Sequence, residues 1–289
     1  MKIVIVGSGG RLGAALARAY ENEHEIERFD HAQLDFNKLD EMRATFADLA
    51  FDLLINCAAL TNVDYCESHR EEATIVNAEA PRILAELCKA KSVRLIHFST
   101  DYVFEGTKQG PYTEDDEARP LSVYGESKLR GERHVLGVSE DFLVTRVSWV
   151  FGPDRPSFID QVISRARQNT EVAAVADKFS TPSYTLDVAQ WLETAWEKKL
   201  HGILHLANEG MCSWQAYAQH ALDCCRRNGM QLQAAKVLPL RLAEMKNFVA
   251  RRPVNSVLST AKFSSSTEAQ PRSWRAAVAE YITNYVAKL

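Results

Sequence analysis

The stretch Ile3-Val4-Ile5-Val6-Gly7-Ser8-Gly9-Gly10-Arg11-Leu12-Gly13 decides the fold of this 289-residue chain. Its first four residues form a continuous apolar run, which is typical of a strand covered on both faces. A helical pattern follows over residues 12–20. Between the two, Gly7 allows a tight turn, Gly10 lets a pyrophosphate approach the backbone, and Gly13 lets the helix pack closely on the sheet. The spacing therefore predicts a dinucleotide-binding strand–turn–helix unit.

An acidic residue follows the second predicted strand, residues 25–29. Asp30 lies 17 residues after Gly13, where a carboxylate accepts hydrogen bonds from ribose hydroxyls and thereby favours NAD(H). Arg11 and Arg28 lie close by in the sequence, and their charges favour a 2′-phosphate instead. NADH and NADPH therefore both stay open as the cofactor.

Strands and helices alternate through the first 150 residues, which predicts an α/β fold with a doubly wound parallel sheet of the Rossmann type. The polar Ser99 and Thr100 close the fourth strand, at the edge where open α/β sheets bind ligands. Further strands are expected at 52–56, 93–98 and 142–147, and helices at 40–49, 71–90 and 127–136.

The pattern changes after residue 150, where prolines break the chain into shorter pieces. An apolar run at 203–206 predicts one more strand of the first sheet. We therefore expect a nucleotide-binding domain over 1–150, with a return to it over about 184–208. Residues 151–183 and 209–289 are expected to form a second, smaller α/β substrate domain, with a helix in its last segment.

Composition excludes several classes of function. The chain has 34 Lys and Arg against 38 Asp and Glu, for a net charge of −4, and no basic stripe that would indicate a nucleic-acid partner. No apolar run reaches the roughly 18 residues of a membrane span. The six cysteines lack CxxC spacing and indicate reduced thiols, so we expect a cytoplasmic protein. Neither histidines nor cysteines show metal-ligand spacing, so no metal site is predicted.

A tyrosine and a lysine stand four residues apart, so that on a helix they share one face. Reduction of a carbonyl needs a proton donor, and the phenol of Tyr124 has an ordinary pKa of about 10. The positive charge of Lys128 favours the phenolate, and its side chain can also bind ribose hydroxyls. With Thr100 upstream, this spacing predicts a reductase site.

Several longer motifs carry a resemblance to a known family. They are Asn56–Ala59, Ser99–Phe104, Tyr124–Glu132, Arg146–Phe151 and Ala250–Ser256. Together with the glycine turn, they resemble the extended short-chain dehydrogenase/reductases and, within these, most closely the dTDP-4-dehydrorhamnose reductases. The resemblance covers nearly the whole chain.

The resemblance implies an NAD(P)H-dependent reduction of the C4 ketone of dTDP-4-dehydro-6-deoxy-L-mannose to dTDP-L-rhamnose. It implies that Tyr124 protonates the C4 oxygen, that Lys128 lowers the pKa of Tyr124, and that Thr100 donates a hydrogen bond. Homodimer formation stays open. The cofactor contacts, from the glycine turn, Asp30 and the resemblance, are expected at Gly7, Gly9, Gly10, Arg11, Leu12, Gly13, Asp30, Asp35, Phe36, Ala58, Ala59, Leu60, Thr61 and Asn77, besides Tyr124 and Lys128.

Substrate contacts are expected at Thr100, Asp101 and Trp149 by the same resemblance. Arg251 and Arg252 are candidates for a diphosphate clamp, because arginine presents a forked set of donors to phosphate oxygens.

Two positions depart from the family. Ala15 replaces the glutamate of metal-dependent members, and Ser180 stands where the family usually has glycine.

Two other functions compete with the reductase. One is a catalytically silent cofactor-binding subunit, like the regulatory subunit of methionine adenosyltransferase. The other is a further nucleotide-sugar reductase, dehydratase or epimerase. A dehydratase of this type looks to need Thr-Asp-Glu, whereas the chain has Thr100-Asp101-Tyr102.

Overall fold

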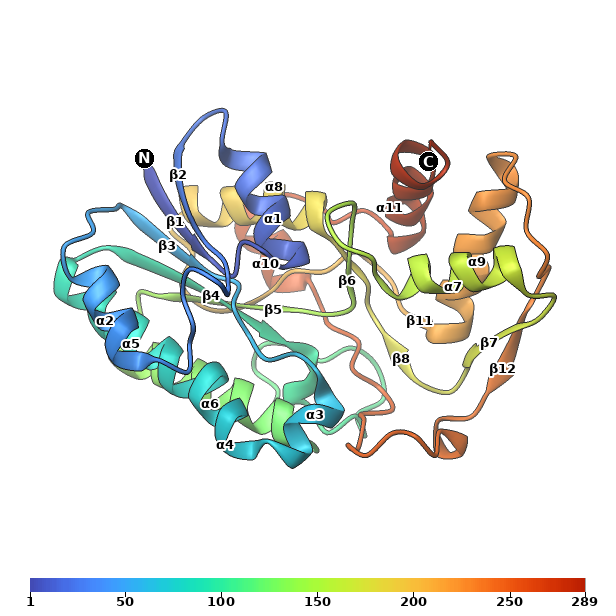
Figure 1. Ribbon diagram of the computed structural model, residues 1–289, viewed down its shortest axis with the longest axis horizontal. Helices are drawn as coiled ribbons and strands as arrows, with labels where there is room; N and C mark the ends of the chain where they lie inside the picture. Colours follow the sequence, from blue (N-terminus) through green and yellow to red (C-terminus); the bar gives the residue numbers. More distant parts are fainter. Residues whose placement is uncertain (289) are drawn as a thin grey trace.

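A six-stranded parallel sheet forms the centre of the computed structural model, which describes residues 1–288 (Figure 1). The strands follow the order β10-β5-β4-β3-β1-β2, and every neighbouring pair is parallel. This order confirms the predicted doubly wound sheet. The strands are β1 (Lys2–Val6), β2 (Glu25–Phe29), β3 (Leu53–Asn56), β4 (Arg94–Thr100), β5 (Leu143–Val147) and β10 (Gly202–His205).

Helices cover both faces of the sheet because successive side chains of each strand point to opposite sides. Ile3 and Ile5 of β1 pack in one buried cluster with α1 (Arg11–Tyr20), α8 (Thr185–Glu197) and α10 (Ala261–Thr267). Val4 and Val6 pack in another with α2 (Leu39–Ala47), α5 (Ala80–Lys91) and α6 (Val123–Val138). This double cover explains why β1 is apolar from Ile3 to Val6.

Helix α6 begins four residues before the predicted start. Ser122 caps it, since its Oγ accepts the backbone N–H of Gly125 at 3.2 Å. The early start places Tyr124 in the first turn, directly after the loop that follows β4. The predicted helix 71–90 is also divided, into α4 (Arg70–Thr74), a π-helical turn at Ile75–Glu79 and α5. A separate short helix, α3 (Val63–Ser68), precedes α4.

The remaining residues form a second packed unit beside the sheet (Figure 1). Its core joins the helices α7 (Phe158–Gln168), α9 (Trp214–Arg227) and α11 (Trp274–Tyr281) to the parallel pair of β7 (Val172–Val175) and β12 (Val237–Leu240). Two short pairs connect to it: β6 (Val150–Phe151) with β9 (Ser183–Tyr184), and β8 (Phe179–Ser180) with β11 (Cys212–Ser213). Strand β10 lies beside β5, but the domain boundaries themselves stay a prediction. Leu289, at the end of the last predicted helix, lies outside the described residues.

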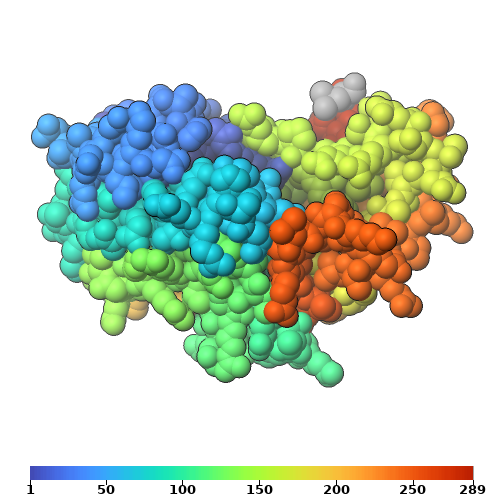
Figure 2. All heavy atoms as spheres, turned by 60° about the horizontal axis from the view of Figure 1, so that its bottom comes forward, coloured from blue at the N-terminus to red at the C-terminus, as the bar shows by residue number. Residues whose placement is uncertain are grey.

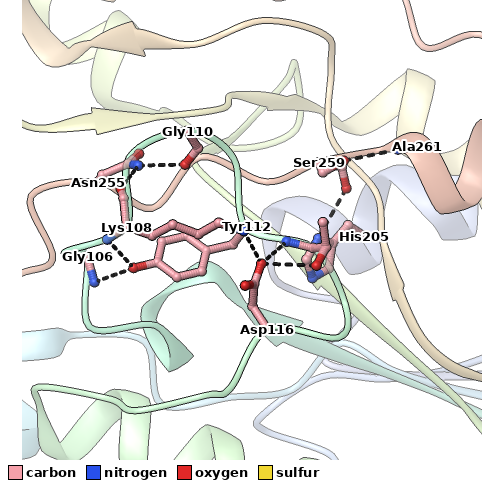
Figure 3. Close-up of polar contacts among 10 residues, drawn as sticks. Gly106, Lys108, Gly110, Tyr112, Asp116, His205, Asn255, Ser259 and Ala261 are labelled. Carbon is pink, nitrogen blue, oxygen red and sulfur yellow. Dashed lines mark hydrogen bonds and ion pairs between the residues drawn. The ribbon is translucent and has the colours of Figure 1, made fainter.

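The long loop between β4 and α6 is fixed by hydrogen bonds rather than by regular structure (Figure 3). The phenol oxygen of Tyr112 accepts the backbone N–H groups of Gly106 and Lys108 at 3.0 and 3.2 Å. From the C-terminal part of the chain, the Asn255 amide donates to the carbonyls of Lys108 and Gly110 at 2.7 and 2.8 Å. These contacts hold the start of α6 in place relative to the last quarter of the chain.

A carboxylate at the start of α3 ties the two units together. Asp64 Oδ1 accepts the backbone N–H groups of Val249 and Ala250, both at 2.9 Å, and Asp64 Oδ2 accepts Arg252 Nη2 at 2.5 Å. Figure 2 shows the orange segment near residue 250 lying against the light-blue segment that contains α3. We call this set of contacts the Asp64 latch.

Within residues 1–288, no helix is both long and apolar enough to cross a membrane.

Candidate active site

The glycine turn is shaped by two contacts within the chain. Gly7 has φ +78°, and a Cβ there would lie 2.5 Å from the backbone nitrogen of Ala58. A Cβ on Gly13 would lie 2.4 Å from the carbonyl oxygen of Gly7. Only glycine fits at either position. At Gly9 a Cβ would lie 3.2 Å from Asp30 Cβ, a tight contact, so the bare backbone lies directly beside the acidic residue.

Two adjoining cavities meet at this turn and share Gly10, Cys57 and Ala59. The first, of about 630 Å³, holds predicted cofactor residues: Gly7, Gly9, Gly10, Asp30, Asp35, Phe36, Ala58, Ala59 and Leu60. The second, of about 530 Å³, holds Gly10, Arg11, Leu12, Gly13, Ala59, Thr61, Thr100, Asp101, Tyr124, Lys128 and Trp149. The chain thus places the predicted cofactor and catalytic residues along one continuous space. A bare glycine backbone beside an acidic residue suits the pyrophosphate and ribose of a dinucleotide.

Tyr124 and Thr100 face the second cavity from α6 and from the end of β4. Burial raises the pKa of the Tyr124 phenol, and the Thr100 side chain acts in the opposite direction. Thr100 Oγ1 donates to Asp101 Oδ1 at 3.2 Å and accepts the Tyr102 N–H at 3.2 Å. Burial is the largest influence on the pKa of Tyr124. The lowering of this pKa by Lys128 stays a prediction.

Lys128 is held between two groups of β4. Its Nζ donates to the carbonyl oxygen of Phe98 at 2.6 Å and lies 3.4 Å from Nε2 of His97. Burial lowers the pKa of Lys128 to about 8, while Glu132 and Cys57 act in the opposite direction. The His97 ring also contacts Asn56, with its Nδ1 3.0 Å from Asn56 Nδ2.

Asp101 lies at the base of the second cavity and is surrounded by hydroxyl groups. Its Oδ2 accepts Ser180 Oγ at 3.0 Å and Ser256 Oγ at 2.5 Å, besides the contact of Oδ1 with Thr100. Three hydroxyl donors satisfy a buried carboxylate in its ionised form. Ser180, the departure from the family, is therefore in direct contact with a predicted substrate residue.

An aromatic wall of the second cavity includes Trp149, Phe158 and Trp214. Trp149 adopts φ +43°, a backbone conformation that residues other than glycine rarely take. Its ring lies 5.4 Å from that of Trp214. Behind the wall, Lys178 is fully buried, with Nζ 5.2 Å from the ring centre of Tyr102 and 5.9 Å from that of Trp149. A ring face attracts a cation, which stabilises this buried charge.

Of four further predicted site residues, three use their side chains within the protein. Arg11 lines the second cavity, but Nε and Nη1 donate to the carbonyls of Arg155 and Val150 at 3.0 and 3.1 Å. Asn77 fastens the loop after β3, since its Oδ1 accepts Leu60 N–H at 2.8 Å and its Nδ2 donates to Ser127 Oγ at 3.0 Å. Arg252 belongs to the Asp64 latch, and Arg251 is exposed. Neither arginine lines the two cavities.

Sequence reasoning missed several residues at the site. His97 is a polar residue in the buried middle of β4, between the apolar Ile96 and Phe98, and this was the available signal. Phe158 and Tyr217 line the second cavity but come from the irregular second unit, where no motif marks them. Trp214 also lines it, and the segment Ser213-Trp214 carries the family resemblance without indicating a role for its ring. Lys178 gave no signal, because its burial depends on rings from three separate segments.

No cluster of three or more His, Cys, Asp or Glu suited to a metal ion occurs in the described part of the chain.

Comparison with known proteins agrees with this geometry. Residues 1–287 match the family described as RmlD substrate binding domain. The dTDP-4-dehydrorhamnose reductase of Burkholderia thailandensis is 32% identical over 289 residues, which cover 96% of this chain and 97% of the relative. A Streptomyces antibioticus protein named probable dTDP-4,6-dihydroxy-2-methyloxan-3-one 4-ketoreductase is 34% identical over 290 residues, with coverage of 99% and 96%.

Among solved structures, dTDP-4-dehydrorhamnose reductase from Bacillus anthracis in complex with NADP superposes with a TM-score of 0.90. It is 28% identical, and the match covers 97% of this chain and 98% of that one. A doubly wound sheet with a glycine turn, and Tyr124, Lys128 and Thr100 at the adjoining cavity, defines the class of NAD(P)-dependent reductases. Within that class, the chain belongs to the RmlD family of nucleotide-sugar reductases.

Proposed function

We propose that this protein reduces the C4 ketone of dTDP-4-dehydro-6-deoxy-L-mannose and forms dTDP-L-rhamnose, with NADPH or NADH as the reductant. The observation that carries the proposal is the convergence of Thr100, Tyr124 and Lys128 on one cavity that adjoins the glycine turn. The relatives named dTDP-4-dehydrorhamnose reductase support the choice of substrate.

The reduced nicotinamide, when bound, supplies a hydride to the carbonyl carbon of the sugar. Tyr124 gives its phenolic proton to the carbonyl oxygen, so that a C–H and an O–H bond replace the carbonyl π bond. Burial keeps Tyr124 protonated until charge develops on that oxygen. Thr100 and Asp101 orient the sugar from the end of β4, and Lys128 binds the cofactor ribose.

The second cavity suits a sugar better than a purely apolar ligand. Trp149 and Trp214 offer flat faces, and the carboxylate of Asp101 offers an acceptor. Because Ser180 donates to that carboxylate, it leaves fewer lone pairs for sugar hydroxyls. The identity of the sugar is accordingly the part of the proposal that needs the most direct test.

The test is turnover with a panel of ketosugars. Purified protein is given NADPH or NADH with dTDP-4-dehydrorhamnose, and the product is identified by NMR. Formation of dTDP-L-rhamnose is expected. Turnover only with another nucleotide ketosugar, such as the one in the name of the Streptomyces relative, would replace the substrate and keep the reaction.

Two further outcomes separate the alternatives. Failure with every ketosugar in the panel would favour a silent cofactor-binding subunit. Tightly retained NAD⁺ and activity without added reductant would indicate an epimerase or dehydratase.

A further inference from the structure

His97 lies in the middle of β4, is completely buried, and contacts two polar side chains. Its Nδ1 is 3.0 Å from Asn56 Nδ2, and its Nε2 is 3.4 Å from Lys128 Nζ. Burial and the neighbouring Lys128 lower the pKa of His97 well below its usual value, so the ring is neutral and carries one hydrogen. The ring nitrogen that carries this hydrogen decides whether His97 presents a donor or an acceptor to Lys128 Nζ.

The neighbouring loop fixes the answer. Asn56 Oδ1 accepts the backbone N–H of Ala58 at 3.0 Å, so the amide nitrogen of Asn56 must face His97. An amide nitrogen donates only, and His97 Nδ1 must therefore accept. The ring hydrogen is then on Nε2, where it points at Lys128 Nζ.

A hydrogen on Nε2 makes His97 a donor toward the lysine nitrogen. The amine form of Lys128 has a lone pair that accepts this hydrogen, whereas the ammonium form has none and would place two donors face to face. Reversing the ring tautomer does not help, because the same conflict then arises between Nδ1–H and Asn56. When Lys128 is protonated, either tautomer of His97 thus leaves two hydrogen-bond donors facing each other in a buried site, at Lys128 or at Asn56.

We infer that His97, held by Asn56, is a positioning residue that makes Lys128 a ready proton donor instead of a permanent cation. The inference rests on the proposed function in one respect. That function gives Lys128 its role, which is to return a proton to the site after Tyr124 has given its own. The titratable groups facing Lys128 are His97 from β4, Cys57 after β3, and Tyr124 and Glu132 on α6. Glu132 is already paired with Arg146 of β5.

The test reads the histidine tautomer and the lysine titration by NMR, without substrate. Two-bond ¹H–¹⁵N spectra are expected to show neutral His97 with its hydrogen on Nε2 between about pH 6 and 9, a range that begins below the ordinary histidine pKa of about 6.5. The Lys128 ¹³Cε resonance should titrate below the ordinary lysine value of about 10.4. A hydrogen on Nδ1, a charged ring, or an ordinary Lys128 titration would overturn the inference.

Asn56→Asp sharpens the test. Its carboxylate accepts both the Ala58 N–H and a hydrogen from His97 Nδ1, so the tautomer should reverse and Nε2 should accept from the ammonium. The pKa of Lys128 should then rise by about one unit, a tenfold change in proton affinity, and the alkaline limb of the pH–rate profile should move with it.

Controls separate the tautomer from other effects. A carboxylate also attracts the ammonium by charge alone, so the double variant Asn56→Asp/His97→Phe is compared with His97→Phe. An equal rise of the Lys128 pKa without the ring would overturn the inference. Thr145→Val, which removes a buried hydroxyl from neighbouring β5, should leave both readouts unchanged. Because the NMR readings require no turnover, an inactive protein would refute the proposed substrate without affecting their result.

Discussion

At the scale of single residues, the site depends on groups whose protonation is set by burial. Tyr124 and Lys128 share one face of α6, and the structure adds that each is buried, with opposite effects on the tendency to hold a proton. Burial disfavours the charged form of any group, so it keeps the phenol protonated and makes the ammonium easier to deprotonate. A proton donor and a residue that reloads it need these two properties.

Replacement of Lys128 by methionine removes the ammonium and keeps most of the apolar stem. We expect kcat to fall by about 10²–10⁴-fold, the range usual for loss of a proton-transfer group. Steady-state kinetics with the accepted ketosugar measure this. Lys198→Met, at an exposed position at the end of α8, is the matched control and should keep the wild-type rate. A near-normal rate for Lys128→Met would remove this residue from the mechanism.

The residues that the sequence predicted are those with a local pattern. Tyr124 and Lys128 were predictable because helical spacing alone brings them together. His97, Lys178 and Ser180 acquire their contacts from strands and loops distant in sequence. Arg252 shows the same limit, because its contact with Asp64 joins segments distant in sequence, while its role in a diphosphate clamp stays a prediction.

At the scale of elements, the glycine turn connects sequence to function most directly. Gly13 lies where α1 meets the loop after β1, and a Cβ there would approach the carbonyl of Gly7 to 2.4 Å. Gly137 is also helical, near the end of α6, but a Cβ there would meet nothing within 4 Å. Substitutions at these two glycines can therefore distinguish the effect of close packing on stability from the effect of helix propensity.

We predict opposite outcomes for alanine at these two positions. Gly13→Ala forces apart the strand–helix contact and should lower the free energy of unfolding by about 1–3 kcal/mol, as overpacking does, together with a loss of affinity for the cofactor. Gly137→Ala should raise the free energy of unfolding by about 0.5–1 kcal/mol, since alanine restricts the unfolded chain. Denaturant unfolding of both variants measures this. Equal effects would show that the close approach at Gly13 has no energetic importance.

The strands were more predictable than the helix boundaries. The inner strands β1 and β3 are buried, which leaves a clear apolar signal in residues 3–6 and 53–55, whereas the edge strand β2 is partly exposed and largely charged. The start of α6 depends on Ser122 as a cap and on the loop that Tyr112 and Asn255 hold. Those hydrogen bonds come from tertiary structure, so hydrophobic periodicity did not reveal them.

At the scale of the whole molecule, the Asp64 latch joins the two packed units beside the second cavity. The Arg252 guanidinium and the backbone N–H groups of Ala250 and Val249 hold the pKa of Asp64 below its ordinary value. A lowered pKa in the folded protein means that the latch stabilises the fold above the ordinary carboxyl pKa of about 3.9 and loses this contribution as the pH falls through the folded value.

Asp64→Asn tests the latch through its pH dependence. The variant should unfold more readily than the wild type at neutral pH, and the difference in free energy of unfolding should shrink only as the pH falls below about 4. Glu126→Gln, which breaks the exposed Arg70–Glu126 pair, is the control and should change stability little at any pH. A difference for Asp64→Asn that is constant with pH would show that its charge is not what holds the two units.

The measurement that tests the central claim most directly is NADPH oxidation with dTDP-4-dehydrorhamnose, by wild type and by Tyr124→Phe. The phenylalanine variant keeps the ring in its buried place and removes the hydroxyl that donates the proton. The wild type should oxidise NADPH in step with formation of dTDP-L-rhamnose, and the variant should still bind NADPH but turn over at least about 10²-fold more slowly. A variant as fast as the wild type would contradict the account.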